Sequence, residues 1–67
     1  MNDTDIIQSG YADALTRLFS VYFDALATGG GDTSAETQAA SEFKAGVALA
    51  RRARDQAVAF VTRGSSG

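Results

Sequence analysis

Three arginines, Arg51, Arg52 and Arg54, form the densest cluster of basic side chains in this 67-residue chain. Guanidinium groups bind phosphates and carboxylates through paired hydrogen bonds, so such a group suggests contact with an anion or a nucleic acid. The charged residues are also unevenly distributed along the chain, with the basic ones concentrated in the same half as these arginines. Residues 34–67 carry five basic and three acidic side chains, whereas residues 1–33 carry one basic and five acidic side chains. Arg51, Arg52 and Arg63 are therefore the candidate anion or nucleic-acid contacts.

The overall charge argues against a nucleic-acid partner. The formal net charge is −2, which gives no general attraction to nucleic acid or to an anionic membrane. Stacking with bases would require aromatic residues among the arginines, and none is present there. Acidic residues near helix starts and Arg63 near a helix end are also what helix dipoles favour. We therefore expect the basic cluster to be solvated and nucleic acid to be a disfavoured partner.

No residue pattern predicts catalysis. The chain has no histidine and no cysteine, so it lacks the ligands of zinc and iron–sulfur sites and cannot form disulfides. It also lacks a nucleotide-binding glycine pattern and the Glu-x-x-His pair of carboxylate-bridged metal sites. We therefore expect a protein that is not an enzyme and that binds no metal or cofactor.

Two segments with the periodicity of amphipathic helices would position these side chains. Over residues 5–28, apolar residues recur at steps of three and four. They are Ile7, Tyr11, Ala14, Leu15, Leu18, Val21, Tyr22, Ala25 and Leu26. Over residues 34–63, a coiled-coil-like series consists of Ala39, Phe43, Gly46, Ala50, Ala53, Ala57 and Phe60. Asp3 or Asp5, the latter with Gln8, is expected to cap the first helix, and Thr33 with Glu36 the second.

A glycine run, Gly29-Gly30-Gly31, is expected to end the first helix, because glycine readily adopts the left-handed conformation. The short glycine-rich turn at 29–33 makes the two helices antiparallel neighbours. The predicted fold is an all-α, antiparallel two-helix hairpin with a polar lead at 1–4 and a flexible tail at 64–67. Opposed residue numbers should then sum to about 62, which places Phe43 near Phe19.

The hairpin has more apolar surface than one helix pair can hide. Below about 70–80 residues a single core rarely supplies enough stability without a staple, and disulfides and structural zinc are excluded here. Oligomerisation, or docking on a larger protein, would complete a helical bundle. Phe19 and Phe23 widen the apolar arc beyond the roughly 100° that one neighbour covers, and small residues lie behind the second helix. The candidate protein interface is Tyr11, Leu15, Phe19, Tyr22, Phe23, Leu26, Ala45, Ala48, Arg54 and Ala59.

Arg54 falls inside the apolar stripe of the second helix, where a charge must be paired or must reach water. One interpretation is that it covers the open end of the hairpin and pairs with Asp5 or with an interhelical acid. The other is that it fixes register across an oligomer interface, as single buried polar residues do in coiled coils.

These features favour a small structural or scaffolding subunit that self-assembles through apolar helix faces into a bundle, ring, shell or filament. A virion component or a secretion filament would be of this kind. The alternatives are a regulatory adaptor hairpin that docks on a larger protein and an RNA-binding hairpin dimer. No segment has the pattern of a signal peptide or of a membrane span. We expect a cytoplasmic location or a place within an assembled particle.

Overall fold

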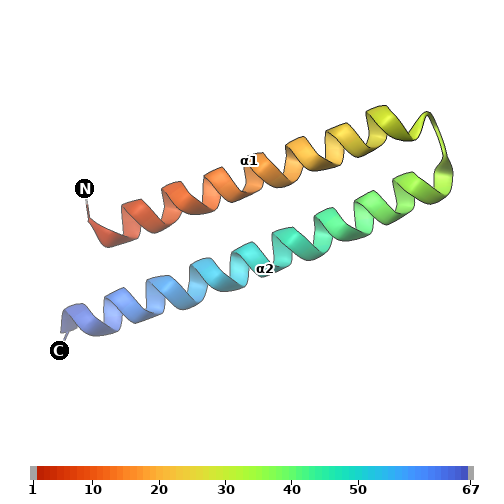
Figure 1. The fold of residues 1–67 in the computed structure, drawn as a ribbon. Helices are drawn as coiled ribbons and strands as arrows, with labels where there is room; N and C mark the ends of the chain where they lie inside the picture. Colours follow the sequence, from red (N-terminus) through yellow and green to blue (C-terminus); the bar gives the residue numbers. More distant parts are fainter. Residues whose placement is uncertain (1, 67) are drawn as a thin grey trace.

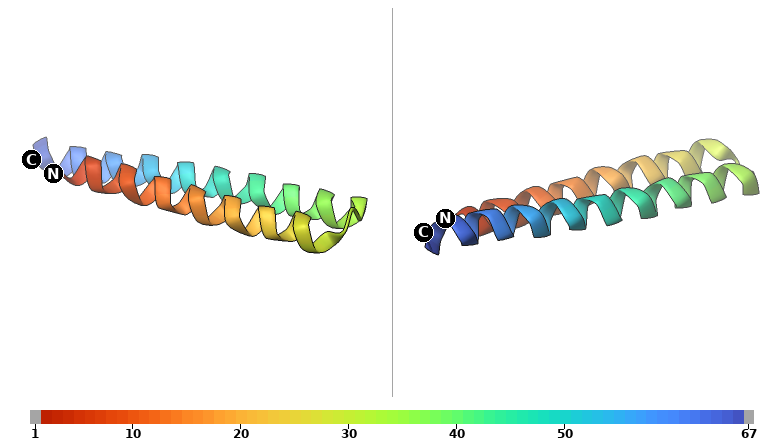
Figure 2. Two further views of the ribbon diagram at one scale, coloured as in Figure 1. Left: turned by 90° about the horizontal axis from the view of Figure 1, so that it is seen from above. Right: turned by 90° about the horizontal axis from the view of Figure 1, so that it is seen from below.

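The structure, a computed structural model, describes residues 2–66, with side chains as far as Arg63. It consists of helix α1, Asp3–Gly29, and helix α2, Thr33–Ser66. The two helices run side by side in opposite directions, with the two ends of the chain together at one end of the molecule (Figure 1). Figure 2 shows from two further sides that they remain neighbours along their whole length. The predicted all-α helical hairpin is confirmed.

Helix α1 begins earlier than expected because Asn2 is its N-cap. Asn2 has an extended backbone, and its side-chain oxygen accepts a hydrogen bond of 2.9 Å from the backbone N–H of Asp5. Asn is as good an N-cap residue as Asp, so the neighbouring candidates compete on nearly equal terms. The expected caps at Asp3 or Asp5 were wrong. Both residues lie instead in the first turn, where their charge favours the helix dipole.

The glycine turn ends α1 as predicted. Gly30 is the C-cap, with φ 59° and ψ 29° in the left-handed region, and Gly31 follows with φ 87°. The backbone N–H of Asp32 donates to the carbonyl oxygen of Gly29 at 3.1 Å, which closes the reversal. Glycine adopts such positive φ values without the steric cost that a Cβ atom imposes.

The capping residue of α2 is Asp32. Its carboxylate accepts a hydrogen bond of 3.0 Å from the N–H of Ser34, and its carbonyl oxygen accepts one from the N–H of Glu36. Thr33 is already within the helix. The expected capping box of Thr33 and Glu36 was therefore wrong by one residue, because an Asp directly before it takes the cap position.

Helix α2 extends beyond the end expected near Thr62 or Arg63, and reaches Ser66. A glycine inside a helix costs only about 1 kcal/mol relative to alanine, so Gly64 alone does not force an end. The expected tail at 64–67 is helical as far as Ser66, and Gly67 lies outside the described residues.

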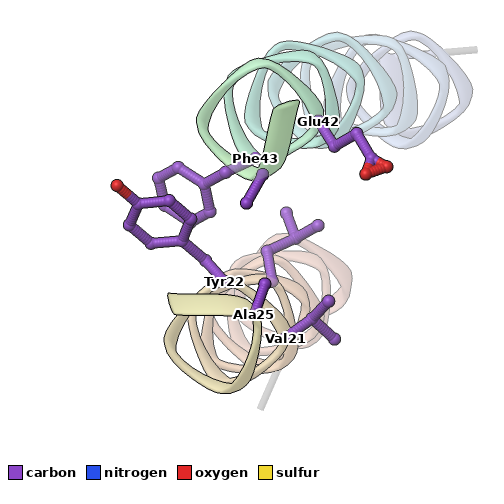
Figure 3. Close-up of a pocket in the computed structure, with 7 residues that line it drawn as sticks. Val21, Tyr22, Ala25, Glu42 and Phe43 are labelled. Carbon is purple, nitrogen blue, oxygen red and sulfur yellow. The ribbon is translucent and has the colours of Figure 1, made fainter. Parts of the chain in front are cut away.

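The helices pair in a register that differs from the expected one. The rings of Tyr22 and Phe43 stack with their centroids 5.1 Å apart and an interplanar angle of 27° (Figure 3). Phe43 therefore lies beside Tyr22, and the prediction that it would lie beside Phe19 was wrong. The first turn of α2 takes part in the chain reversal, so Ala35 is the residue that packs against Gly29. Opposed residue numbers accordingly sum to about 65, nearly one helical turn from the expected value.

The hairpin has a seam instead of an enclosed core. Among the described residues none is buried, and those facing the other helix are half-buried at most. The Cα trace measures 53 × 19 × 6 Å, so the molecule is a single flat layer of two helices. Its radius of gyration is 15.7 Å, whereas a compact domain of this length would have about 11 Å.

Candidate protein-interaction surfaces

Five of the predicted interface residues pack inside the hairpin itself. Tyr11, Leu15, Tyr22, Leu26 and Arg54 are all half-buried at the seam between α1 and α2. The seam occupies their apolar surface whether or not a second chain is present. Exposed surface elsewhere on the helices must supply most of any contact with a partner.

Arg54 is held within the hairpin by two neighbours. Its guanidinium carbon lies 4.4 Å from the centre of the Tyr11 ring, and its Nε lies 3.1 Å from Oδ1 of Asp55. A cation over an aromatic face is attracted by the ring electrons, and the apolar stem of arginine packs along the seam. The expected pairing with Asp5 or with an interhelical acid was wrong, because the observed register places Arg54 at Tyr11 and Asp55 belongs to the same helix. These contacts support the interpretation that Arg54 covers the seam.

Gly46 of α2 lies in close contact with α1. A Cβ atom on residue 46 would lie 2.5 Å from Cδ2 of Leu18, closer than real Cβ contacts. Leu18 therefore occupies a notch that the missing side chain leaves open. The notch brings the helix backbones together and makes the surface beside it shallow.

Large apolar side chains nevertheless remain exposed on both sides of the seam. Among the described residues, six have exposed fractions between 55% and 69%. These six are Ile6, Phe19, Val21, Phe23, Leu49 and Phe60. Isolated exposed apolar residues are ordinary, whereas contiguous ones usually mark a contact. Whether these six residues form a contact surface therefore depends on which of them lie next to one another on the helices.

We call the first surface the groove face. It contains a hollow of about 150 Å³ nearer the turn and a second hollow of about 360 Å³ at its centre. The first is lined by Leu18, Val21, Tyr22, Ala25, Ala39, Glu42 and Phe43. The second is lined by Ala14, Arg17, Leu18, Gly46, Leu49, Ala50 and Ala53. Leu18 lines both, so the two hollows lie next to each other along the seam.

Figure 3 looks along the helices at the turn end of the groove face. Val21 of α1 and Glu42 of α2 lie on one side of the helix pair, and the rings of Tyr22 and Phe43 lie on the other. Ile6 and Phe60 extend the groove face toward the open end. Each lies eleven residues, just over three whole turns, from Arg17 or Leu49 and so points in nearly the same direction.

The second surface is the aromatic ridge, formed by Phe19 and Phe23 on α1. Their ring centroids are 6.4 Å apart, and the side chains of Ser20 and Asp24 border the hollow beside them. Both rings point away from the groove face, since Phe19 follows the groove residue Leu18 by about 100° and Phe23 follows Tyr22 by the same angle. The sequence-based prediction of a partner depended on these two residues together with the small residues on the outer side of α2.

The remaining predicted residues lie on the outer surface of α2. Ala45, Ala48 and Ala59 are exposed, and so are the three arginines of the candidate anion contact. Arg51 and Arg52 point about 100° apart because they are consecutive in a helix, and Arg63 lies roughly 18 Å from Arg51 along the axis. The three guanidinium groups therefore do not converge on one phosphate-sized site.

The four large exposed side chains of the groove face were not recognised from the sequence. Val21 and Phe60 were assigned to the seam, whereas both are largely exposed, and Ile6 and Leu49 were left out. A usable signal was present, because Leu49, Ala53 and Phe60 follow one another at steps of four and seven along α2. The alanine-rich stripe beside them concealed this second stripe.

The structure offers few signs of other kinds of site. Within residues 2–66 neither helix contains a stretch both long and apolar enough to cross a membrane. In the same residues no three acidic side chains gather where they would hold a metal ion. Comparison with protein-family models, with curated proteins and with solved structures gives no significant match to this chain.

Proposed function

We propose that this chain is a small, non-enzymatic structural subunit that assembles with copies of itself through its exposed apolar faces. One observation carries the proposal. The chain is 45% hydrophobic, yet none of its described residues is buried. A sequence with this composition normally folds around a core, and a second chain is the direct way for this hairpin to acquire one.

The size of the exposed surface supports the same proposal. The hairpin exposes 4963 Å², whereas a folded monomer of its mass of 6.9 kDa exposes about 4,000 Å². The surplus of about 1,000 Å² is close to the roughly 800 Å² that each partner buries in a standard protein interface. Covering this surplus once would bring the chain to the surface area of an ordinary small domain.

The two surfaces on opposite sides of the seam also bear on the kind of assembly. A contact through the groove face alone closes a dimeric four-helix bundle, as isologous contacts do. A further contact through the aromatic ridge would join bundles into a ring, shell or filament. A structural component of a particle or filament requires such a second contact, and Phe19 and Phe23 are placed to provide it.

Sedimentation velocity and far-UV circular dichroism over a dilution series test this proposal. We expect a defined oligomer, or larger species, at micromolar concentration, and we expect helix content to fall together with mass on dilution because folding and assembly are coupled. A monomer that stays helical at every concentration would contradict the proposal.

Two alternatives predict different results. A regulatory adaptor, whose partner is a larger protein, would remain a monomer or a partly unfolded chain when purified alone. An RNA-binding dimer would shift generic RNA in a gel, and the shift would weaken steeply with salt. The scattered positions of Arg51, Arg52 and Arg63 make the RNA alternative the weaker of the two.

A further inference from the structure

We propose that the groove face is the contact surface for a second copy of this chain, and that the two hairpins pack face to face with their glycine turns at opposite ends. The inference rests on the self-assembly proposed above and assigns its surface, orientation and register. The surplus of about 1,000 Å² per chain is enough for one such interface.

Side-chain size changes along the groove face in a way that favours this orientation. Ile6 and Phe60 are large and lie near the chain ends, whereas Ala25 and Ala39 lie near the turn. Helices separate by a distance that the side chains at their contact determine. Opposite orientation places each large end over the alanine end of the other copy. If both turns were at the same end, four large side chains would meet at one end and the alanines would be held apart.

The register of α2 follows from matching the two copies along their full length. The midpoint of Thr33–Ser66 falls at Leu49 and Ala50, so residue numbers that lie level across the interface sum to about 99. Phe60 is then level with Ala39 of the second copy. Leu49 lies beside its own equivalent at the two-fold axis, above the small residues Ala50 and Ala53 that line the central hollow. This is the knob-and-hole arrangement of packed helices.

Gly10 supplies a second, independent argument, because the hairpin itself does not need a glycine there. A Cβ atom on residue 10 would have nothing within 4 Å, although glycine inside a helix is less favourable than alanine. The midpoint of Asp3–Gly29 is Thr16, so level residues of α1 sum to about 32. Val21, the most exposed of the large apolar residues, then lies over Gly10 and Tyr11 of the second copy. Gly10 and Val21 share a helix face, so each would meet the other across the interface.

Charges at the edge of the groove face agree with this register. Arg17 lines the face near the midpoint of α1, and Asp13 lies one turn before it on the same edge. In the proposed register Asp13 lies within about 3 Å, along the helix axis, of Arg17 in the second copy. The two arginines that approach the two-fold axis are thus each met by a carboxylate of the other chain. A rim pair of this kind selects register more than it adds affinity.

The absence of cysteine from the chain permits a direct test of the orientation. A spin label on Ser34→Cys, at the start of α2, would be separated from its equivalent by about 45 Å in the proposed dimer, measured as a dipolar distance. With both turns at the same end, the distance would be below roughly 20 Å. A short distance overturns the orientation and leaves self-assembly intact. Loss of the dipolar signal, together with a monomer mass, would instead contradict the proposed function.

Disulfide formation tests the surface and the register. Leu49→Cys should oxidise to a symmetric disulfide dimer that keeps the helix content of the parent. Ala48→Cys, exposed on the outer side of α2, is the matched control. We expect Leu49→Cys to cross-link at least about tenfold faster, because a paired interface raises the effective thiol concentration to the millimolar range. Equal rates for the two variants would overturn the proposal, as would preferential cross-linking of Leu49→Cys to Phe23→Cys in a mixture.

Discussion

Leu18 fits the hairpin only because residue 46 has no side chain. The two residues meet at the seam between α1 and α2, with Cδ2 of Leu18 only 2.5 Å from the position that a Cβ atom on residue 46 would take. The contact also separates the two hollows of the groove face, since Leu18 lines both. The pair therefore sets both the distance between the helices and the shape of the surface beside them.

Gly46→Ala should leave the free energy of unfolding nearly unchanged in the parent chain. Alanine gains about 1 kcal/mol of helix propensity, and moving the flexible end of Leu18 to another rotamer costs about the same. In a Leu18→Ala background that cost is absent, so Gly46→Ala should then stabilise by about 1 kcal/mol. Urea unfolding of the four chains at one protein concentration measures this coupling.

The control for this cycle is Ala48→Gly. Ala48 is exposed, so its replacement should cost about 1 kcal/mol with either residue at position 18. A coupling energy near zero between Leu18 and Gly46 would show that the two residues do not share the notch.

The elements of this fold were predictable, whereas their register was not. Alanine-rich sequence with steps of three and four, interrupted by Gly30 and Gly31, determines two helices and a reversal. The caps were misplaced because Asn2 and Asp32 stand beside other good capping residues, and local preference does not separate them. The pairing of Phe43 with Tyr22 depends on how the first turn of α2 completes the reversal, which no periodicity records.

The candidate surfaces were only partly predictable, for a related reason. Phe19 and Phe23 exceed one apolar stripe plainly and can be recognised without a structure. On α2 the seam is built mostly from alanine, so Leu49 and Phe60 resemble members of a single wide stripe. Only the position of Leu18 in the Gly46 notch shows where the seam ends and the groove face begins.

Gly10→Leu should strengthen the isolated helix and weaken the assembly. Leucine is a better helix former than glycine by several tenths of a kcal/mol, and it has open space within the hairpin. In the proposed dimer it would fill the position over which Val21 of the second copy packs, so we expect the dissociation constant to rise at least about tenfold. Sedimentation equilibrium measures this constant. Ala48→Leu, exposed on the outer side of α2, adds a comparable side chain and should change it little.

Arg54→Met should leave the size of the oligomer unchanged. Methionine keeps an apolar stem over Tyr11 and loses the cation over the ring, so the free energy of unfolding should fall by about 0.5–1 kcal/mol. The accompanying ion pair with the exposed Asp55 contributes little. Light scattering reports the mass, and thermal unfolding the stability. A change in mass would show that Arg54 reaches across an interface, the interpretation that its contacts within the hairpin do not favour.

Leu49→Asp and Phe23→Asp should distinguish the roles of the groove face and the aromatic ridge in assembly. A carboxylate at position 49 would be desolvated at the centre of the groove contact, at a cost of several kcal/mol, and should yield monomers with reduced helix content. A carboxylate at position 23 disrupts only the aromatic ridge, so the dimer should persist while larger species disappear. Sedimentation velocity distinguishes these outcomes, and Ser41→Asp, exposed on the outer side of α2, is the control. If both variants gave monomers, the ridge would belong to the primary interface; if neither altered the mass, the apolar surplus would have no role in self-assembly.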